Sequence, residues 1–332
     1  MDSLTQFVLG GAVGAVTLQS PSKKTILWAG AVATIPDLDV LLEPLYADGN
    51  FVVVHRSFSH SILCTLLLSG ILAKFTLKKH PFWKSFQFYF LVLFTHALLD
   101  CCTTYGTQLF WPFDRRLISF NNIHVFEPIY TLLLSIPLGI VFFSKKTVPR
   151  KLAWLYLGLT LSTSYLAWTF VSKHIAKTVI VENLAQQKIT YDKLLLTPTP
   201  FNSILWKAIV KRKDTYYFGS YALSDGKRSI NFYELQHQPE LLTNIKDYCD
   251  TQTMLRHCDG FPFVVGDTNK ISIYAVKFGP ANYAHPPEFI LPFQATRLPL
   301  TNDYEFKIVD NRFEQRTAKS YNQELFERIF SP

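Results

Sequence analysis

The chain has 332 residues, which is long for one domain, and its composition divides it into two unlike halves. Apolar runs dominate from Leu4 to about Val171, whereas charged residues are dense from Lys173 onward. The net charge of +8 does not indicate nucleic-acid binding, because the basic residues lie in short groups between apolar runs or are scattered through the second half. The five cysteines contain no CxxC pair, which argues against a structural zinc finger; a Cys249–Cys258 disulfide and two unrelated thiols stay equally open.

Six apolar runs in the first half are candidates for membrane helices, because a bilayer core requires about 20 apolar residues per helix. The runs are 4–18, 25–45, 59–77, 86–101, 126–144 and 152–171. The first and fourth are short, so four to six spans are expected. In the first run, Gly10, Gly11 and Gly14 recur at helical spacing, which would let another helix approach closely. A merely flexible apolar stretch is the alternative.

The distribution of Lys and Arg predicts an orientation, because cytoplasmic loops carry the excess of these residues. With six helices, the loops after the first, third and fifth hold ten basic residues and the alternate loops hold three. The predicted fold is therefore a mostly α polytopic membrane domain of about six helices, residues 1–172, followed by a small α+β soluble domain, residues 173–332, outside the cytoplasm. In that second domain we expect a helix at 181–196, a break at 197–200, and strands at 216–223, 229–235, 271–278 and 304–309.

Three pairs of polar residues interrupt the apolar runs. Two Asp lie in Ile-Pro-Asp-Leu-Asp near the end of the second run, two His precede the third, and a His and an Asp stand four apart near the end of the fourth. Under the six-helix topology all of them fall at one membrane face. Neutral imidazoles and carboxylates are ligands of zinc and similar divalent ions, and unpaired buried carboxylates are costly. The predicted metal ligands are Asp37, Asp39, His55, His60, His96 and Asp100.

Other interpretations of these residues stay open. The polar pairs would also suit a hydrogen-bonded plug that joins helices, or a proton path in a transporter. Arg56 and the pair Arg115 and Arg116 suit a phosphate by charge and shape, but anchoring to lipid headgroups is an equal alternative. The aromatic residues of 110–113 are typical of an interfacial belt rather than a substrate site.

The first 144 residues resemble a known family. The likeness is carried by Asp-Ser-Leu-Thr-Gln at 2–6, Pro-Asp-Leu-Asp at 36–39, His-Arg-Ser-Phe-Ser-His-Ser at 55–61, Thr-His-Ala-Leu-Leu-Asp at 95–100, Thr-Thr-Tyr-Gly-Thr at 103–107, Trp-Pro-Phe at 111–113 and Phe-Glu-Pro-Ile-Tyr-Thr at 126–131. This ordered set is similar to the YdjM-like family of membrane-bound metal-dependent hydrolases. That family is distantly similar to the zinc-dependent phospholipase C and single-strand nuclease superfamily, whose His and Asp ligands hold a cluster of zinc ions.

The resemblance implies that the same six His and Asp residues bind metal, with zinc as the first candidate and one or more ions. Two positions depart from the family pattern. Gln6 stands where members often have His, so one ligand can be lost, and Glu127 stands where Asp is common. His124 and Glu127 would either complete the ligand set or be solvated loop residues.

The expected function is hydrolysis by metal-activated water of a phosphoester or a lipid-linked substrate at the outer face of a bacterial inner membrane. Asp37 or Asp39 is expected as ligand or base, and Arg56 as a contact to a phosphoester. The expected partners are the lipid bilayer and a lipid-linked or phosphorylated substrate, without nucleic acid. A transporter or channel component and a non-enzymatic envelope scaffold are the alternatives.

Overall fold

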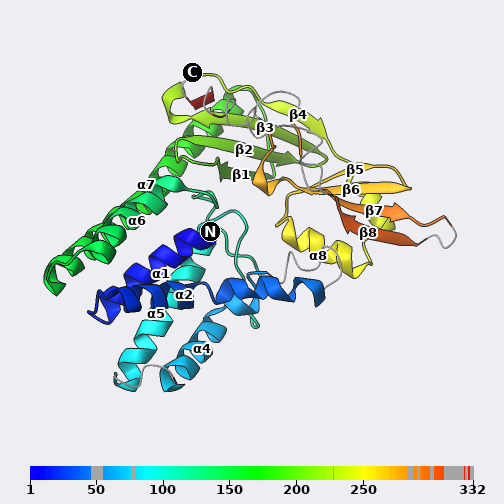
Figure 1. Ribbon diagram of the computed structural model, residues 1–332. Helices are drawn as coiled ribbons and strands as arrows, with labels where there is room; N and C mark the ends of the chain where they lie inside the picture. Colours follow the sequence, from blue (N-terminus) through cyan, green and yellow to red (C-terminus); the bar gives the residue numbers. More distant parts are fainter. Residues whose placement is uncertain are drawn as a thin grey trace. The chain divides into compact units, whose positions relative to one another are not determined.

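The computed structural model describes residues 1–45, 55–75, 80–226, 228–282, 287–289, 292–299 and 303–309, together with 325, 328 and 329 (Figure 1). These residues form two compact units. The first contains 1–42, the described residues from 55 to 170, and 200–202; the second contains 43–45, 171–199 and the remaining described residues from 203 onward. The division falls inside one long helix, between Phe170 and Val171.

The first unit is helical. Its elements are α1 (Ser3–Thr17), α2 (Lys23–Ala33), the 3₁₀ helices η1 (Pro36–Leu45) and η2 (Phe58–His60), α4 (Ile62–Phe75), α5 (Phe82–Cys101), α6 (Pro128–Phe143) and the first part of α7 (Val148–Gln186). Local sequence signals explain several of the helix starts. The Asp2 and Ser22 side chains accept hydrogen bonds from the backbone N–H groups of Thr5 and Thr25, and Pro128 opens α6.

The glycines of α1 lie where α2 packs closest. A Cβ atom at Gly10 would be 2.2 Å from the Ala33 Cβ atom, and one at Gly14 would be 2.4 Å from the Ala29 Cβ atom. No side chain larger than hydrogen fits at that spacing. The predicted close approach of another helix to these glycines is confirmed.

The predicted polytopic membrane domain is wrong. No single helix among the described residues is both long enough and apolar enough to cross a bilayer. Among the described residues, one pair of consecutive helical segments, α2 and Pro36–Leu42, is together long enough and apolar enough for a span. That pair is bent by 48° at its break.

Four of the six apolar runs mislead because they fold as helices too short to cross a bilayer, whereas the run 152–171 lies inside the 39-residue α7, which is long enough but not apolar enough. The helices α1, α2, α4 and α6 have 15, 11, 14 and 16 residues, fewer than the roughly 20 of a span. The run 25–45 breaks before Pro36, which cannot donate a backbone hydrogen bond. The helix α5 has 20 residues but includes Lys84, His96 and Asp100. The predicted placement of residues 173–332 outside the cytoplasm assumed six membrane spans. Without those spans, this placement has no support.

The second unit contains two four-stranded antiparallel sheets. The first has the order β1-β2-β3-β4 and is formed by β1 (Lys193–Pro198), β2 (Leu205–Arg212), β3 (Thr215–Ala222) and β4 (Tyr233–Gln236). The second has the order β5-β6-β7-β8 and is formed by β5 (Pro262–Gly266), β6 (Lys270–Ala275), β7 (Phe293–Arg297) and β8 (Tyr304–Ile308). The last turns of α7 pack on the first sheet through Ala176, Ile180 and Leu184, and α8 (Cys249–His257) packs beside the second.

The four predicted strands coincide with β3, β4, β6 and β8, although β4 begins later than expected. The predicted helix at 181–196 is right for 181–186, which are the end of α7, and wrong beyond Gln186, because Leu194, Leu195 and Leu196 pair with β2. Three consecutive leucines suit a buried strand as well as a helix, so the sequence pattern alone could not decide between them.

Candidate metal centre

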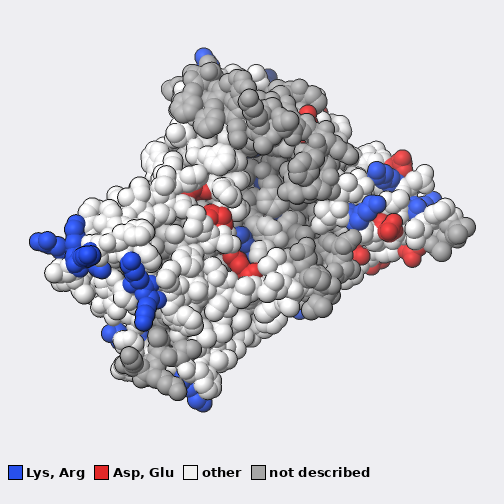
Figure 2. Space-filling model, viewed as in Figure 1, with Lys and Arg blue, Asp and Glu red and all other residues white. Residues whose placement is uncertain are grey.

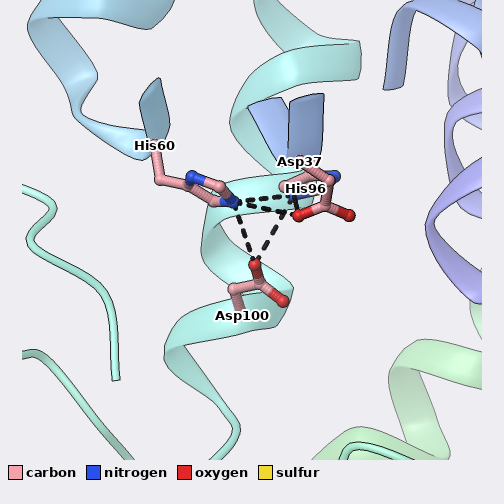
Figure 3. A group of neighbouring side chains, drawn as sticks. All are labelled: Asp37, His60, His96 and Asp100. Atoms are coloured by element: carbon pink, nitrogen blue, oxygen red, sulfur yellow. Dashed lines mark hydrogen bonds and ion pairs between the residues drawn. The ribbon is translucent and has the colours of Figure 1, made fainter. Parts of the chain in front are cut away.

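Four side chains from three separate elements converge in the helical unit: Asp37, His60, His96 and Asp100 (Figure 3). We call this group the Asp–His centre. Asp37 is in the first turn of η1, His60 ends η2, and the other two lie four residues apart near the end of α5. That spacing places both on one face of α5, one turn apart.

The distances within the Asp–His centre match those expected between metal ligands. The His60 and His96 Nε2 atoms are 3.1 Å apart. Each Nε2 atom lies 3.4 Å from Asp37 Oδ1, and the Asp100 Oδ2 atom is 3.3 Å from His60 Nε2 and 3.5 Å from His96 Nε2. Ligands at the corners of a tetrahedron, each roughly 2.1 Å from a zinc ion, are roughly 3.4 Å from one another. Two nitrogens and two oxygens therefore surround a space of the right size for one cation.

Burial and charge also suit a cation. His60, His96 and Asp100 are fully buried, and the Asp37 side chain is 19% exposed. Asp100 Oδ2 is buried and accepts no hydrogen bond among the described residues, and its near neighbours are the two Nε2 atoms and, at 3.3 Å, Arg56 Nε. Asp37 is thus the member of the centre that contacts solvent.

The pKa shifts follow from the same geometry. Burial alone would raise the pKa of Asp37, but the adjacent imidazoles of His60 and His96 lower it well below the usual range. Burial would lower the pKa of His96, and the carboxylates of Asp100 and Asp37 outweigh burial and raise it. The carboxylates are thus held ionised, as metal ligands need to be.

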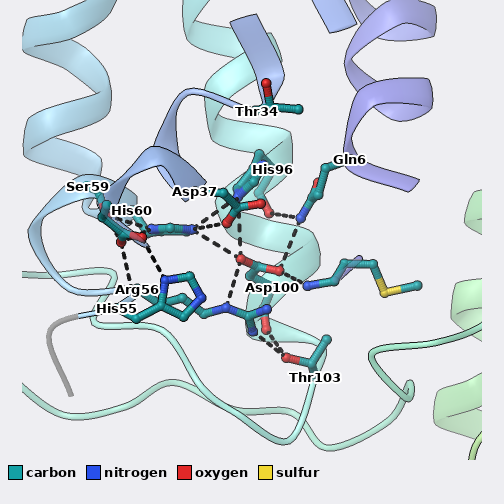
Figure 4. A network of polar contacts seen from close by, with 12 residues as sticks. Gln6, Thr34, Asp37, His55, Arg56, Ser59, His60, His96, Asp100 and Thr103 are labelled. Atoms are coloured by element: carbon teal, nitrogen blue, oxygen red, sulfur yellow. Dashed lines mark hydrogen bonds and ion pairs between the residues drawn. The ribbon is translucent and has the colours of Figure 1, made fainter. Parts of the chain in front are cut away.

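Asp39 and His55 are not among the four ligand atoms and form a second pair with each other; Figure 4 labels His55 beside the centre. Asp39 Oδ1 lies 2.7 Å from His55 Nδ1, and Asp39 Oδ2 accepts from the Ser59 hydroxyl at 2.6 Å. The Ser59 oxygen is also 2.9 Å from His60 Nδ1. Because Ser59 gives its single proton to the carboxylate, it must accept one from Nδ1 of His60. The Nε2 lone pair of His60 then faces the centre, as metal ligation requires.

Arg56 is almost completely buried and its guanidinium is held by neighbouring side chains (Figure 4). Its Nε atom is 3.3 Å from Asp100 Oδ2, its Nη1 donates to Thr103 Oγ1 at 2.9 Å, and it stacks over Tyr105 at 4.9 Å. The backbone of Arg56 is in the left-handed region, at φ 63°, where its N–H donates to Asp39 and its carbonyl accepts from Gln108. Arg56 therefore orients Asp100 and adds positive charge beside it.

Gln6 reaches the opposite oxygen of Asp100. Its Nε2 atom donates to Asp100 Oδ1 at 3.1 Å and to the His96 carbonyl at 3.3 Å, and the Met1 ammonium pairs with the same Oδ1. The side chain that stands where the family often has His thus acts as a donor to a ligand carboxylate.

The remaining candidates lie elsewhere. Glu127 is buried but its Oε1 accepts from the Tyr165 hydroxyl at 3.0 Å, and the His124 ring caps the backbone N–H of Phe126. Arg116 pairs with Asp114 at the surface, and Arg115 is exposed. The predicted interfacial aromatics Phe110 and Phe113 are exposed, and Trp111 packs on Phe58.

All five cysteines are free thiols, so the Cys249–Cys258 disulfide is not formed.

Sequence reasoning missed the supporting residues Ser59, Thr103 and Tyr105. Each stands inside a motif that was already singled out, next to or within a few residues of a ligand. Their position in the motif was the available signal, but hydroxyl groups are too common in loops for sequence spacing to assign them a partner.

Comparisons with known proteins show the family to which the first half of the chain is similar. Residues 1–176 match the family model described as YdjM inner membrane protein. The "Uncharacterized protein YfhP" of Bacillus subtilis (strain 168) is 29% identical over 139 residues, which cover 39% of this chain and 42% of that protein. The chain thus spans less than half the length of this relative, and no solved structure matches it. The family match covers more than half of the chain and includes every residue of the Asp–His centre, so the chain belongs to the YdjM inner membrane protein family.

Proposed function

We propose that this protein is a membrane-bound, metal-dependent hydrolase whose Asp–His centre holds a divalent cation. The observation that carries the proposal is the approach of two imidazole nitrogens and two carboxylate oxygens to within 4.8 Å of one another in a buried space. Two nitrogens and two oxygens at tetrahedral spacing favour zinc over magnesium or calcium, which take oxygen ligands. A bound zinc ion would supply a Lewis acid and an activated water.

The residues around the centre have distinct tasks in this proposal. His60, His96 and Asp100 hold the cation from the buried side, while Asp37 ligates it or accepts a proton on the side that solvent reaches. Asp39 acts through Ser59 on the orientation of His60, and Arg56 acts on Asp100. Because the Arg56 guanidinium is already engaged inside the protein, the expectation that Arg56 contacts a substrate phosphoester has no support in the structure.

Membership of an inner membrane family supports an amphiphilic substrate. The preferred substrate class is a phosphoester or another hydrolysable bond in a lipid-linked molecule, which would approach the Asp37 side. A transporter that uses the same buried charges would also need the four side chains, but it would not need a bound cation at neutral pH.

The test is the metal content of the full-length protein and of the Asp100→Asn variant. The wild type is expected to retain about one zinc ion per chain after dialysis against metal-free buffer at pH 7. The Asp100→Asn variant is expected to lose most of it, since an amide is a poor zinc ligand.

The matched control is Asp114→Asn, which removes a carboxylate that pairs with Arg116 at the surface. Its metal content should equal that of the wild type. A wild type that binds no transition metal, or a D100N variant that binds as much zinc as the wild type, would contradict the metal centre and favour the transporter or the scaffold.

A further inference from the structure

The described acidic residues of the helical unit lie at one set of helix ends, and most of its described basic residues lie at the other; Arg56, Arg115 and Arg116 are the exceptions and lie near the acidic residues. Its described Asp and Glu side chains lie at the start of α1 and α6, at the end of α5, in η1 or in the loop after α5. They are Asp2, Asp37, Asp39, Asp100, Asp114 and Glu127. At the other helix ends stand eight basic residues, which we call the basic end: Lys23, Lys24, Lys74, Lys84, Lys145, Lys146, Arg150 and Lys151.

Contacts between helices show that parts of the basic end lie together. The ammonium group of Lys23, at the start of α2, is 5.0 Å from the ring of Phe142 at the end of α6. The indole of Trp28 in α2 donates to the hydroxyl of Tyr89 in the first half of α5. On the left of Figure 2, groups of Lys and Arg lie at the edge of the molecule, apart from the Asp and Glu nearer the middle of the view.

No described carboxylate forms an ion pair with the basic end. Among the described residues, none of its eight side chains forms an ion pair, and most of them are exposed. Large aromatic side chains stand beside them in contact with solvent: Trp83 is 70% exposed and Phe143 is 79% exposed. Exposed aromatic rings next to unpaired cations are unfavourable in water and typical of the layer where lipid headgroups meet acyl chains.

We propose that the basic end binds the headgroups of anionic phospholipids. The lipid phosphates complement the eight unpaired cations, and the aromatic rings beside them enter the boundary of the acyl chains. An acidic soluble protein would satisfy the charges but would leave the exposed face of a ring such as Phe143 in contact with water. The inner membrane family to which the chain belongs makes a lipid surface the partner that fits both features. This proposal does not depend on the hydrolase function.

The test compares binding of fluorescent phosphatidylglycerol and phosphatidylcholine to the full-length protein in an uncharged detergent. The wild type should prefer the anionic lipid, and the preference should fall as salt is raised. The variant Lys24→Gln/Lys145→Gln removes two charges without shortening the side chains by much. Its preference for phosphatidylglycerol should fall about 30-fold, which corresponds to about 1 kcal/mol for each Lys near an anionic surface.

The control is Lys246→Gln/Lys270→Gln, which removes two exposed lysines of the second unit and should leave the preference unchanged. Equal binding of the two lipids by the wild type would overturn the proposal, as would equal losses in both double variants. Displacement of the anionic lipid by a DNA duplex at equal phosphate concentration would assign the basic end to nucleic acid instead.

Discussion

Ser59 connects two groups that would otherwise be independent. Its hydroxyl donates to Asp39 and accepts from His60, so one small side chain sets which nitrogen of His60 carries the proton. A metal ligand whose tautomer is fixed in advance loses less free energy when it binds the ion.

The Ser59→Ala variant should therefore bind zinc about 10- to 100-fold more weakly, the range found when a group that supports a metal ligand is removed. The change leaves the four ligand atoms in place, so the helical content should not alter. Competition with a fluorescent zinc chelator measures the affinity. The control is Ser144→Ala, whose hydroxyl accepts from the Lys146 backbone far from the Asp–His centre. An unchanged affinity in S59A would show that Ser59 does not orient His60.

Glu127 is a buried carboxyl group whose hydrogen-bond partner, the Tyr165 hydroxyl, carries no charge, so its titration should affect stability. Burial raises the pKa of Glu127 to about 7, against a smaller lowering by the Tyr165 hydroxyl. A carboxyl group with a raised pKa favours the folded state while it is protonated. Its contribution is fully present below the unfolded pKa of about 4.3 and is lost as pH rises through about 7.

We expect the free energy of unfolding of the wild type, relative to Glu127→Gln, to fall by on the order of 3 kcal/mol between pH 4.5 and pH 8. Both proteins contain the His residues of the centre, so the contribution of their titration cancels when the two free energies of unfolding are subtracted. Denaturant unfolding in detergent at several pH values measures it. The exposed Glu182→Gln variant should show no such trend, and parallel curves for wild type and E127Q would refute the expectation.

At the scale of the elements, the contact between α1 and α2 controls the position of two parts of the site. Helix α1 carries Gln6, which donates to Asp100, and α2 leads into η1, which carries Asp37. The glycines that allow the close approach therefore act on the Asp–His centre from a distance.

The Gly10→Ala variant places a methyl group where the Ala33 Cβ atom already lies, so the helices must separate. We expect a loss of about 1–3 kcal/mol of stability, as for other overpacked cores, together with weaker zinc binding. Gly139→Ala in α6 is the matched control, since a Cβ atom there meets nothing within 4 Å. That variant should be neutral or up to about 1 kcal/mol more stable, because Ala is the better helix former. Thermal unfolding separates the two outcomes, and equal stability of both variants would argue against a tight α1–α2 contact.

The elements also show where sequence reasoning reached its limit. The spacing of His96 and Asp100 was sufficient to place both on one helix face, and the alternation at 271–278 was sufficient to find β6. The membrane spans failed because hydropathy counts apolar residues without seeing the break before Pro36 or the limited length of α1 and α4. The assignment of Asp39 to the ligands could not be checked from sequence, since ligand and supporting carboxylates have the same chemistry. Only three-dimensional distances separate Asp37 from Asp39.

At the scale of the whole molecule, the ligands belong to one of the two compact units. All four lie in the first unit, so a cation that binds them stabilises that unit directly. A ligand at 100 times its dissociation constant adds about 2.7 kcal/mol to the state that binds it.

Addition of zinc should therefore slow amide hydrogen exchange in α1, α5 and η2 and leave β2, β3 and β6 unchanged. Exchange followed by mass spectrometry of peptides from both units tests this in one experiment. The Asp100→Asn protein serves as the control and should show no response to zinc. Protection of both units to the same degree would show that they unfold together rather than separately.

The separation of the ligands along the chain has a kinetic consequence. His60 and His96 lie 36 residues apart, and each stands in a different element. Helices form in about a microsecond from local contacts, whereas joining distant segments requires loop closure. The complete ligand set thus comes into existence only after η1, η2 and α5 have docked. A cation held by the four atoms would cross-link those segments, and because three of its four ligands are buried, a chelator would gain access to them when one of the segments detaches. We therefore expect chelators to remove it at a rate set by local opening of the protein rather than by chelator concentration.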